Sequence, residues 1–132
     1  MKKCLLYFSI IMIFLLMVLS CSKKAYNNIN LKKALDIMTK STNLVLLDVR
    51  TAEEYMSGSL PNSINIDVMD TDFKTKINIL DKNKEYIVYC RSGNRSLIAS
   101  SIMATNGFLH VYNLANVNYS DFVNAVLTNE QY

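Results

Sequence analysis

Hydrophobic and polar positions follow two spacings along residues 30–127. Continuous apolar runs at 44–48 and 86–90 are typical of strands buried on both faces, and shorter runs predict strands at 64–67 and 109–112. Between them, apolar residues recur at helical spacing, which predicts helices over 31–40, 51–56, 72–80, 97–106 and 119–127. Strands that alternate with helices pair in parallel, so we expect an α/β domain with a central parallel sheet.

The N-terminus has a different pattern. Lys2 and Lys3 precede an uncharged, mostly apolar run of 16 residues from Cys4 to Leu19, which is typical of a secretory signal. The run ends at 18–21, Val-Leu-Ser-Cys, which resembles a bacterial lipoprotein processing site. We expect a signal peptide over 1–20, lipidation (palmitate) at Cys21, a short polar tether over 21–29 and a folded domain over 30–132.

An uncleaved N-terminal anchor helix is the alternative. Either arrangement tethers the domain to a membrane of the bacterial cell envelope, on its periplasmic or extracytoplasmic face. Without Lys2 and Lys3 the basic count falls from 14 to 12 against 11 acidic residues. No basic block or aromatic-interleaved stripe remains, so we expect no nucleic-acid partner. We expect a monomer.

The chain has three cysteines, and two of them, Cys4 and Cys21, belong to the N-terminal signal. Cys90 is left as a free thiol with no partner for an intramolecular disulfide. A lone buried cysteine is ordinarily a small core hydrophobe. Here it ends the predicted strand at 86–90, where open α/β sheets place their ligands.

The loop after Cys90 favours a functional role. Its backbone N–H groups and the first turn of the next helix would converge on the sulfur and favour the thiolate. Gly93 and Asn94 tolerate a left-handed backbone, and Ser96 is a candidate N-cap. The pattern indicates a nucleophile or an anion-binding cup.

Two segments carry a resemblance to a known family. Cys-Arg-Ser-Gly-Asn-Arg-Ser at 90–96 resembles the active-site loop of the rhodanese (sulfurtransferase) family. Leu-Leu-Asp-Val-Arg-Thr-Ala-Glu-Glu-Tyr at 46–55, with Gly58, Pro61 and Ile-Asn-Ile at 64–66, resembles its second motif. The order and spacing are those of the family. The resemblance implies a rhodanese-like fold with helices on both faces of the parallel sheet.

The resemblance also implies a reaction. Cys90 would take a sulfane sulfur from thiosulfate, a polysulfide or a persulfide and pass it, as a persulfide, to cyanide or a thiol, with no metal or organic cofactor. The expected substrate-binding residues are Arg91, Ser92, Gly93, Asn94, Arg95 and Ser96. Arg95 could attract the anion and support the thiolate, hold the base of the loop in a salt bridge, or do both. Arg91 either attracts the donor or is simply solvated.

Asp48 and Arg50 have a structural interpretation. Arg50 could pair with Glu54 and tie the strand end to the next helix, while Asp48 is a possible border of the pocket. His110 is expected to be structural or exposed. The cysteine and histidine residues show no spacing typical of a metal site.

There are two alternatives to a sulfurtransferase. The first is a phosphatase, which the loop length disfavours: phosphatases of this fold have five residues between cysteine and arginine, whereas four separate Cys90 from Arg95. The segment 114–122 lacks the glycine pair and tryptophan common in the family, which could reshape the mouth beside Cys90; Phe122 could take the tryptophan's packing role. The second alternative is therefore a non-catalytic, envelope-tethered sulfane-sulfur carrier or protein-interaction module.

Overall fold

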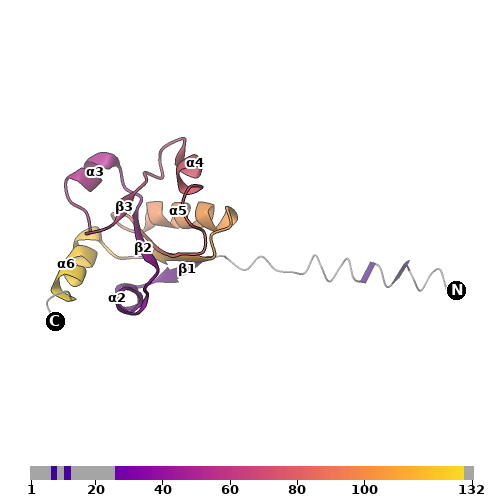
Figure 1. Ribbon diagram of the computed structural model, residues 1–132, viewed down its shortest axis with the longest axis horizontal. Helices are drawn as coiled ribbons and strands as arrows, with labels where there is room; N and C mark the ends of the chain where they lie inside the picture. Colours follow the sequence, from indigo (N-terminus) through magenta and orange to yellow (C-terminus); the bar gives the residue numbers. More distant parts are fainter. Residues whose placement is uncertain (1–6, 9–10, 13–25, 130–132) are drawn as a thin grey trace.

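The computed structural model describes residues 7–8, 11–12 and 26–129. Within 26–129 the strands and helices alternate along the chain (Figure 1). The strands are β1 (Tyr26–Ile29), β2 (Leu44–Asp48), β3 (Ile64–Asn65), β4 (Glu85–Tyr89) and β5 (His110–Leu114). The helices are α2 (Leu31–Lys40), α3 (Ala52–Met56), α4 (Phe73–Ile77), α5 (Asn94–Thr105) and α6 (Tyr119–Asn129).

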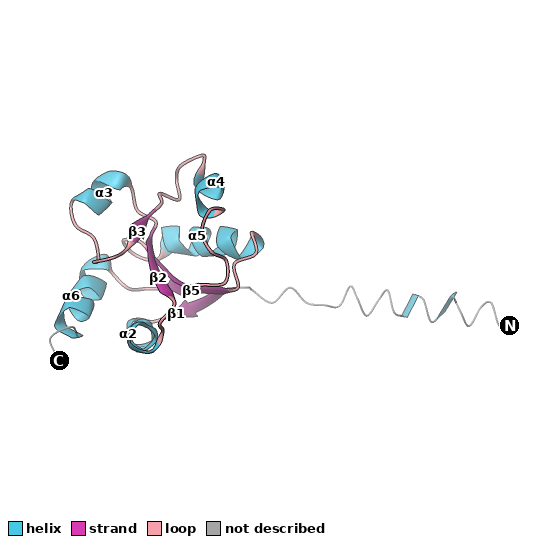
Figure 2. Cartoon of the chain, viewed as in Figure 1, coloured by secondary structure: helices cyan, strands magenta, loops and turns pink. Residues whose placement is uncertain are grey.

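The five strands form one parallel sheet in the order β1-β5-β4-β2-β3. Helices α2 and α6 cover one face, and α4 and α5 cover the other (Figure 2). This confirms the expected α/β fold with a central parallel sheet and helices on both faces. The central strand β4 is buried along 86–89, as a continuous apolar run predicts for a strand covered on both sides.

Each face of the sheet has its own hydrophobic core. On the α5 side, Tyr86 meets Phe108 edge to face at 5.3 Å between ring centroids. On the other side, Tyr89 meets Phe122 in the same way at 5.4 Å. Aromatic pairs in this geometry contribute about 0.5–1.5 kcal/mol beyond the area they bury. Phe122 is fully buried, so this aromatic residue anchors α6 on the sheet.

The N-terminal boundary of the domain differs from the expectation. Residues 26–29, expected as part of a polar tether, form the edge strand β1, which pairs with β5 from Tyr26 opposite Val111 to Ile29 opposite Leu114. The exposed residues Asn27 and Asn28 interrupt the apolar pattern and so conceal this strand in the sequence. In the structure, the Asn28 side chain accepts a hydrogen bond from Asn113 on β5 at 2.8 Å. Of the predicted signal peptide, the structure describes only residues 7–8 and 11–12, and the Cys21 lipidation site lies outside the described residues.

Helix α4 is shorter than the predicted helix over 72–80 and covers only Phe73–Ile77. Asp72 stands at its N-cap position, but its side chain makes no capping hydrogen bond. That carboxylate instead pairs with Lys76 at 3.1 Å. Without a cap the first turn gains little stability, and the chain packs through its two buried residues, Phe73 and Ile77.

Candidate active site

The carboxyl ends of β2 and β4 lie side by side. Asp48 is opposite Tyr89 in the register, and the Val49 N–H donates to the Tyr89 carbonyl at 3.0 Å. After β2 the chain continues to β3 on one side of the sheet, and after β4 it continues to β5 on the other. Ligand sites of open α/β sheets form at such a switch point. Cys90 is the first residue after β4 and therefore stands there.

Cys90 lies inside a cradle built by the next turn. Cys90 is only 3% exposed. The Gly93 N–H donates to Sγ at 3.1 Å, and Sγ lies 3.6 Å from the Ser96 hydroxyl. Gly93 has a left-handed φ of +98°, which glycine adopts without steric cost.

The helix begins earlier than the sequence predicted. Gly93 stands at the N-cap and α5 starts at Asn94, so Ser96 is not the N-cap. Ser96 lies in the first turn, fully buried, and its hydroxyl donates to the Gly93 carbonyl at 3.0 Å. The left-handed Gly93 lets the helix start right behind the cysteine. Asn94, expected to share the left-handed backbone, is the first helical residue.

The electrostatics of the cradle favour the thiolate. Burial raises the pKa of the Cys90 thiol. Hydrogen bonding with the Ser96 hydroxyl and with the backbone N–H groups of Ser96, Ser92 and Gly93 outweighs that effect, so the pKa lies below its ordinary value. The N-terminal end of α5 adds its dipole in the same direction. Cys90 is thus suited to act as a nucleophile.

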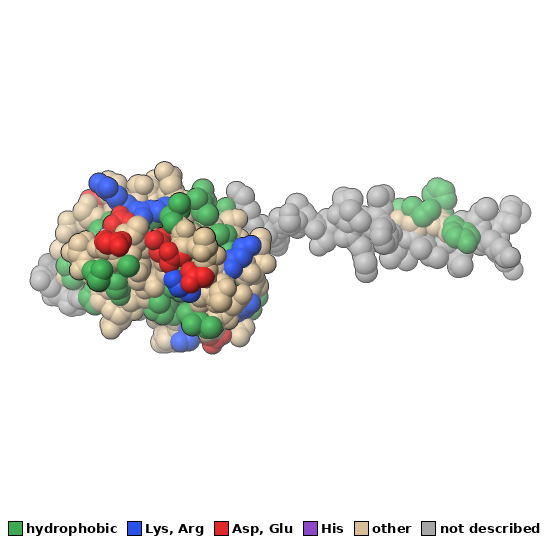
Figure 3. Space-filling model, turned by 90° about the horizontal axis from the view of Figure 1, so that it is seen from above, with side chains coloured by type: hydrophobic (Ala, Val, Ile, Leu, Met, Phe, Trp, Pro, Cys, Tyr) green, Lys and Arg blue, Asp and Glu red, His purple; other side chains and the backbone are tan. Residues whose placement is uncertain are grey.

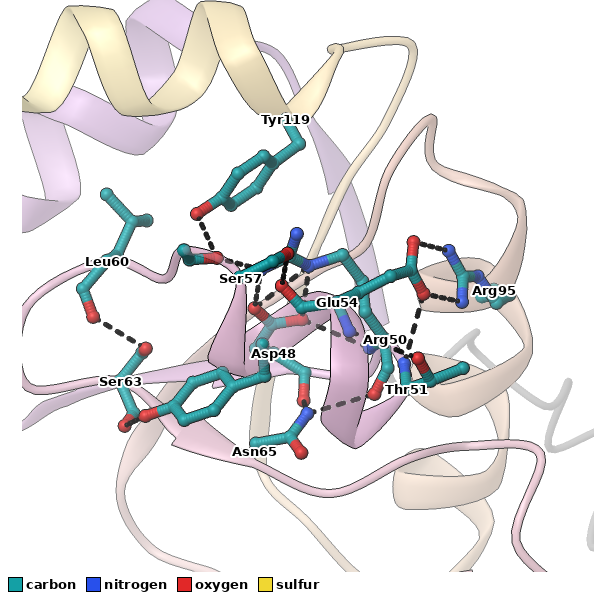
Figure 4. A network of polar contacts seen from close by, with 12 residues as sticks. Asp48, Arg50, Thr51, Glu54, Ser57, Leu60, Ser63, Asn65, Arg95 and Tyr119 are labelled. Carbon is teal, nitrogen blue, oxygen red and sulfur yellow. Dashed lines mark hydrogen bonds and ion pairs between the residues drawn. The ribbon is translucent and has the colours of Figure 1, made fainter.

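Arg95 holds the loop to a distant part of the chain. Its guanidinium donates two hydrogen bonds to the Glu54 carboxylate, at 2.6 and 2.9 Å (Figure 4). The same carboxylate closes a capping box with Thr51 at the start of α3. The pKa of Glu54 is lowered to about 2, first by the Arg95 hydrogen bonds. The salt bridge considered for Arg95 at the base of the loop is therefore present.

We expected Arg50 to pair with Glu54, but it pairs with Asp48. Two residues after the strand end it folds back, and its Nε and Nη2 donate to the Asp48 carboxylate at 2.7–3.0 Å. Its Nη2 also donates to the Gly58 carbonyl at 2.8 Å. Glu54 is unavailable to it because Arg95 and the cap engage both carboxylate oxygens. Asp48 is fully buried behind Arg50 and is not a lining residue of the pocket described next.

Tyr119, at the start of α6, packs against Arg50 and the cysteine loop. Its ring lies flat over Arg50, with the guanidinium carbon 3.7 Å from the ring centroid. Its hydroxyl donates to the Gly58 carbonyl at 2.7 Å, and its backbone N–H donates to the Arg91 carbonyl at 2.9 Å. Figure 4 shows this ring above the Asp48–Arg50 pair. One residue thus connects α6, the segment after α3 and the cysteine loop.

A pocket of about 570 Å³ opens beside the loop. Its lining consists of Arg50, Glu54, Arg91, Asn118, Tyr119 and Ser120. Three of these residues come from the segment 114–122, where the sequence departs from the family pattern. That departure was the only sequence signal for them, and it named no individual side chain. Among the predicted binding residues, Arg91 lines this pocket, Gly93 and Ser96 are buried in the cradle, and Ser92 and Asn94 are exposed at the loop surface.

The described residues outside this pocket were expected to hold no metal site. On the face shown in Figure 3, acidic, basic and hydrophobic side chains are interspersed, and no large patch of like charge is visible. His110 is exposed at the start of β5. In the described ranges, no group of histidine, cysteine and acidic residues is arranged to hold a metal ion. Nor is any helix of the described residues long and apolar enough to cross a membrane.

Comparison with known proteins identifies the fold. The structure resembles a rhodanese-related protein from Thermoplasma volcanium with a TM-score of 0.60 and 30% sequence identity, over 81% of this chain and 95% of that one. A protein of Bacillus subtilis named as a candidate sulfurtransferase is 40% identical over 65 residues, 49% of this chain and 61% of that protein. A tRNA uridine(34) hydroxylase of Buchnera aphidicola is 35% identical over 88 residues, 64% of this chain and 28% of the relative. The chain therefore spans less than two thirds of the length of these two curated relatives.

The family model for the rhodanese-like domain matches residues 30–116. That range contains the sheet from β2 to β5, the cysteine loop with its cradle, and the Glu54–Arg95 pair. Helix α6, which supplies Tyr119, lies beyond it. This chain therefore belongs to the rhodanese-like domain family.

Proposed function

We propose that this chain is a rhodanese-type sulfurtransferase in which Cys90 carries the transferred sulfur as a persulfide. The observation that carries the proposal is the Gly93 N–H aimed at Cys90 Sγ at 3.1 Å, in a cradle that lowers the pKa of the thiol. The sulfurtransferase name of the Bacillus subtilis relative supports it. No other cysteine lies in residues 22–132.

The reaction has two displacements. The Cys90 thiolate attacks the sulfane sulfur of thiosulfate; the new S–S bond forms as the bond to the second sulfur breaks, and sulfite leaves with its electron pair. The resulting Cys90 persulfide anion then gives its outer sulfur to cyanide, forming thiocyanate, or to a thiolate, forming a new persulfide, and the Cys90 thiolate is restored. A persulfide can replace thiosulfate as donor in the same first step, with a thiolate as leaving group, and so can a polysulfide, with a polysulfide one sulfur shorter or hydrosulfide as leaving group.

The site residues take different parts in this reaction. Loop N–H groups that hold the thiolate also stabilise the charge when it moves to the outer sulfur, because they were organised before the reaction. Arg91 attracts the anionic donor at the pocket mouth. Arg95 is a positioning residue, since its guanidinium is engaged by Glu54.

The test is thiosulfate:cyanide sulfurtransferase activity of the full chain, with Cys90→Ser as control and mass detection of sulfur on the peptide that contains Cys90. Thiocyanate formation that disappears in Cys90→Ser supports the proposal. Persulfide loading of Cys90 with slow turnover on every small acceptor would indicate a sulfane-sulfur carrier. Absence of both loading and turnover, with thiosulfate and with polysulfide, would overturn the sulfurtransferase.

We also propose that the protein is anchored to the bacterial cell envelope through a lipid on Cys21. The basis is the sequence signal of residues 1–21 alone. Expression of the full chain and of Cys21→Ser in a bacterial host tests it. Membrane fractionation and metabolic labelling with palmitate should find the parent chain acylated and the variant unlabelled. Labelling of both chains alike would contradict the assignment of Cys21.

A further inference from the structure

Tyr119 covers a cation that would otherwise face the pocket. The flat face of the Arg50 guanidinium lies 3.7 Å from the ring centroid, which is the geometry of a cation–π contact. The Arg50 side chain is 5% exposed although it is a lining residue. The hydroxyl bond to Gly58 and the backbone bond to Arg91 fix the ring in place.

The charges of the pocket fall into two groups. Arg50 is paired with buried Asp48, and Glu54 is paired with Arg95. Arg91 is exposed and forms no ion pair with the described residues. A molecule that enters the pocket therefore meets one uncompensated positive charge.

We propose that Tyr119 sets the charge selectivity of this pocket by covering Arg50, so that Arg91 alone attracts an anionic reactant toward Cys90. With Arg91 as the one open cation, the pocket attracts an anionic reactant more weakly than it would if Arg50 were open as well. Removal of the ring exposes the outer face of Arg50, and because its partner Asp48 is buried behind it, the positive potential in the pocket rises. As a statement about sulfur donors this rests on the proposed function, but the charge selectivity can be measured without sulfur transfer.

The experiment compares alkylation of Cys90 by iodoacetate, a monoanion, and by iodoacetamide, a neutral reagent of similar size. Rates are measured on the full chain at low ionic strength, by mass spectrometry of the Cys90 peptide. The ratio of the two rates cancels changes in the thiol's own pKa and accessibility. Tyr119→Ala should raise the iodoacetate:iodoacetamide ratio about threefold or more, because the higher positive potential raises the local concentration of the anion. Tyr119→Phe keeps the ring and should keep the parent ratio.

Arg91→Ala is the second variant, and it does not depend on the tolerance of residue 119 to truncation. Arg91 is exposed, so its replacement should leave the fold intact, and the ratio should fall about threefold or more. The proposal is overturned if Arg91→Ala keeps the parent ratio, if a folded Tyr119→Ala does, or if Tyr119→Phe shifts it as far as Tyr119→Ala. It is also overturned if Cys90 reacts with neither reagent, since the pocket would then not lead to the sulfur. If the parent chain transfers no sulfur but the variants shift the alkylation ratio as expected, the proposed function fails and the role of Tyr119 stands.

Discussion

Glu54 and Arg95 stand 41 residues apart in the chain and are joined by two hydrogen bonds, of 2.6 and 2.9 Å. Glu54 lies in the first turn of α3, and Arg95 lies in the first turn of α5 directly after the cysteine loop. The pair therefore ties the end of the loop to the structure that follows β2. Both side chains are about a quarter to a third exposed, so solvent screens the attraction between the two charges only in part.

Replacement of Glu54 by Gln should destabilise the domain by about 1–2 kcal/mol, because it removes a charge-assisted pair and weakens the capping box. For a domain of this size that corresponds to a fall in Tm of roughly 5–10 °C. Thermal unfolding followed by circular dichroism measures it. Glu53→Gln is the matched control, since Glu53 is exposed in the same turn and has no hydrogen-bond or ion-pair partner among the described residues. Equal losses in the two variants would contradict the role of the pair.

The same pair predicts a dependence of stability on pH. Arg95 lowers the pKa of Glu54 from 4.5 to about 2 in the folded protein. Because the folded-state pKa lies below the unfolded one, the contribution is fully present above about pH 4.5 and is lost as the pH falls toward 2. After allowance for solvent screening, the loss is about 1–2 kcal/mol. Denaturant unfolding at pH 5.5 and at pH 3 measures it, and the pH 3 deficit should be smaller by this amount in Glu54→Gln.

The order of the secondary-structure elements and the position of Cys90 could be predicted from sequence because both depend on local signals. Apolar runs mark the strands, and the Cys-to-Arg spacing marks the loop. The partners of Arg50 and Arg95 could not be predicted in this way. Arg50 is four residues from Glu54 in the sequence and Arg95 is 41 residues away, and only the folded arrangement of the chain brings Arg95 to the Glu54 carboxylate. Edge strand β1 was missed because its exposed polar residues Asn27 and Asn28 interrupt the apolar pattern.

Tyr119 was beyond sequence reasoning for a different reason. Its role arises from contacts with Arg50, Gly58 and Arg91, which three separate segments supply. Asn62, by contrast, adopts a left-handed φ of +58°, which asparagine tolerates better than most residues.

Replacement of Ser96 by Ala should make Cys90 less acidic. In the thiol form the S–H points to the Ser96 oxygen at 3.6 Å, and in the thiolate form the hydroxyl can turn its proton to the sulfur. Burial raises the pKa of Cys90, and Ser96 is the first of the groups that lower it. Loss of one hydrogen bond, about 0.5–1.5 kcal/mol, should reduce the rate of Cys90 alkylation by iodoacetamide near neutral pH about threefold or more. The midpoint of the rate–pH curve should move to higher pH.

Ser101→Ala is the control for that experiment, because Ser101 lies in the same helix but is exposed. It should leave the alkylation curve unchanged. A curve that moves equally in both variants would show that helix stability, and not the hydroxyl beside the sulfur, sets the acidity of Cys90.

Replacement of Gly93 by Ala should disrupt the cradle through two separate effects. The φ of +98° is unfavourable for a residue with a Cβ, which costs about 1–2 kcal/mol. In addition, the new Cβ would stand 3.1 Å from the Asn116 backbone nitrogen and 3.4 Å from the Leu114 carbonyl oxygen. Backbone atoms cannot yield as a flexible side chain does, so the loop must shift and the N–H leaves the sulfur. We expect a loss of about 2–3 kcal/mol in the free energy of unfolding together with a slower reaction of Cys90 with iodoacetamide.

Gly107→Ala separates the two effects. Gly107 has a similar φ of +87°, but a Cβ there would meet only the end of the Lys82 side chain, at 3.8 Å. It carries the backbone strain without the clash and lies away from the cysteine loop, beyond the far end of α5. Denaturant unfolding should therefore show a smaller loss for Gly107→Ala than for Gly93→Ala, and Cys90 should react at the parent rate. If Gly93→Ala lost no more stability than Gly107→Ala and kept the reactivity of Cys90, the close packing of the loop against residues 114–116 would not be what holds the cradle in place.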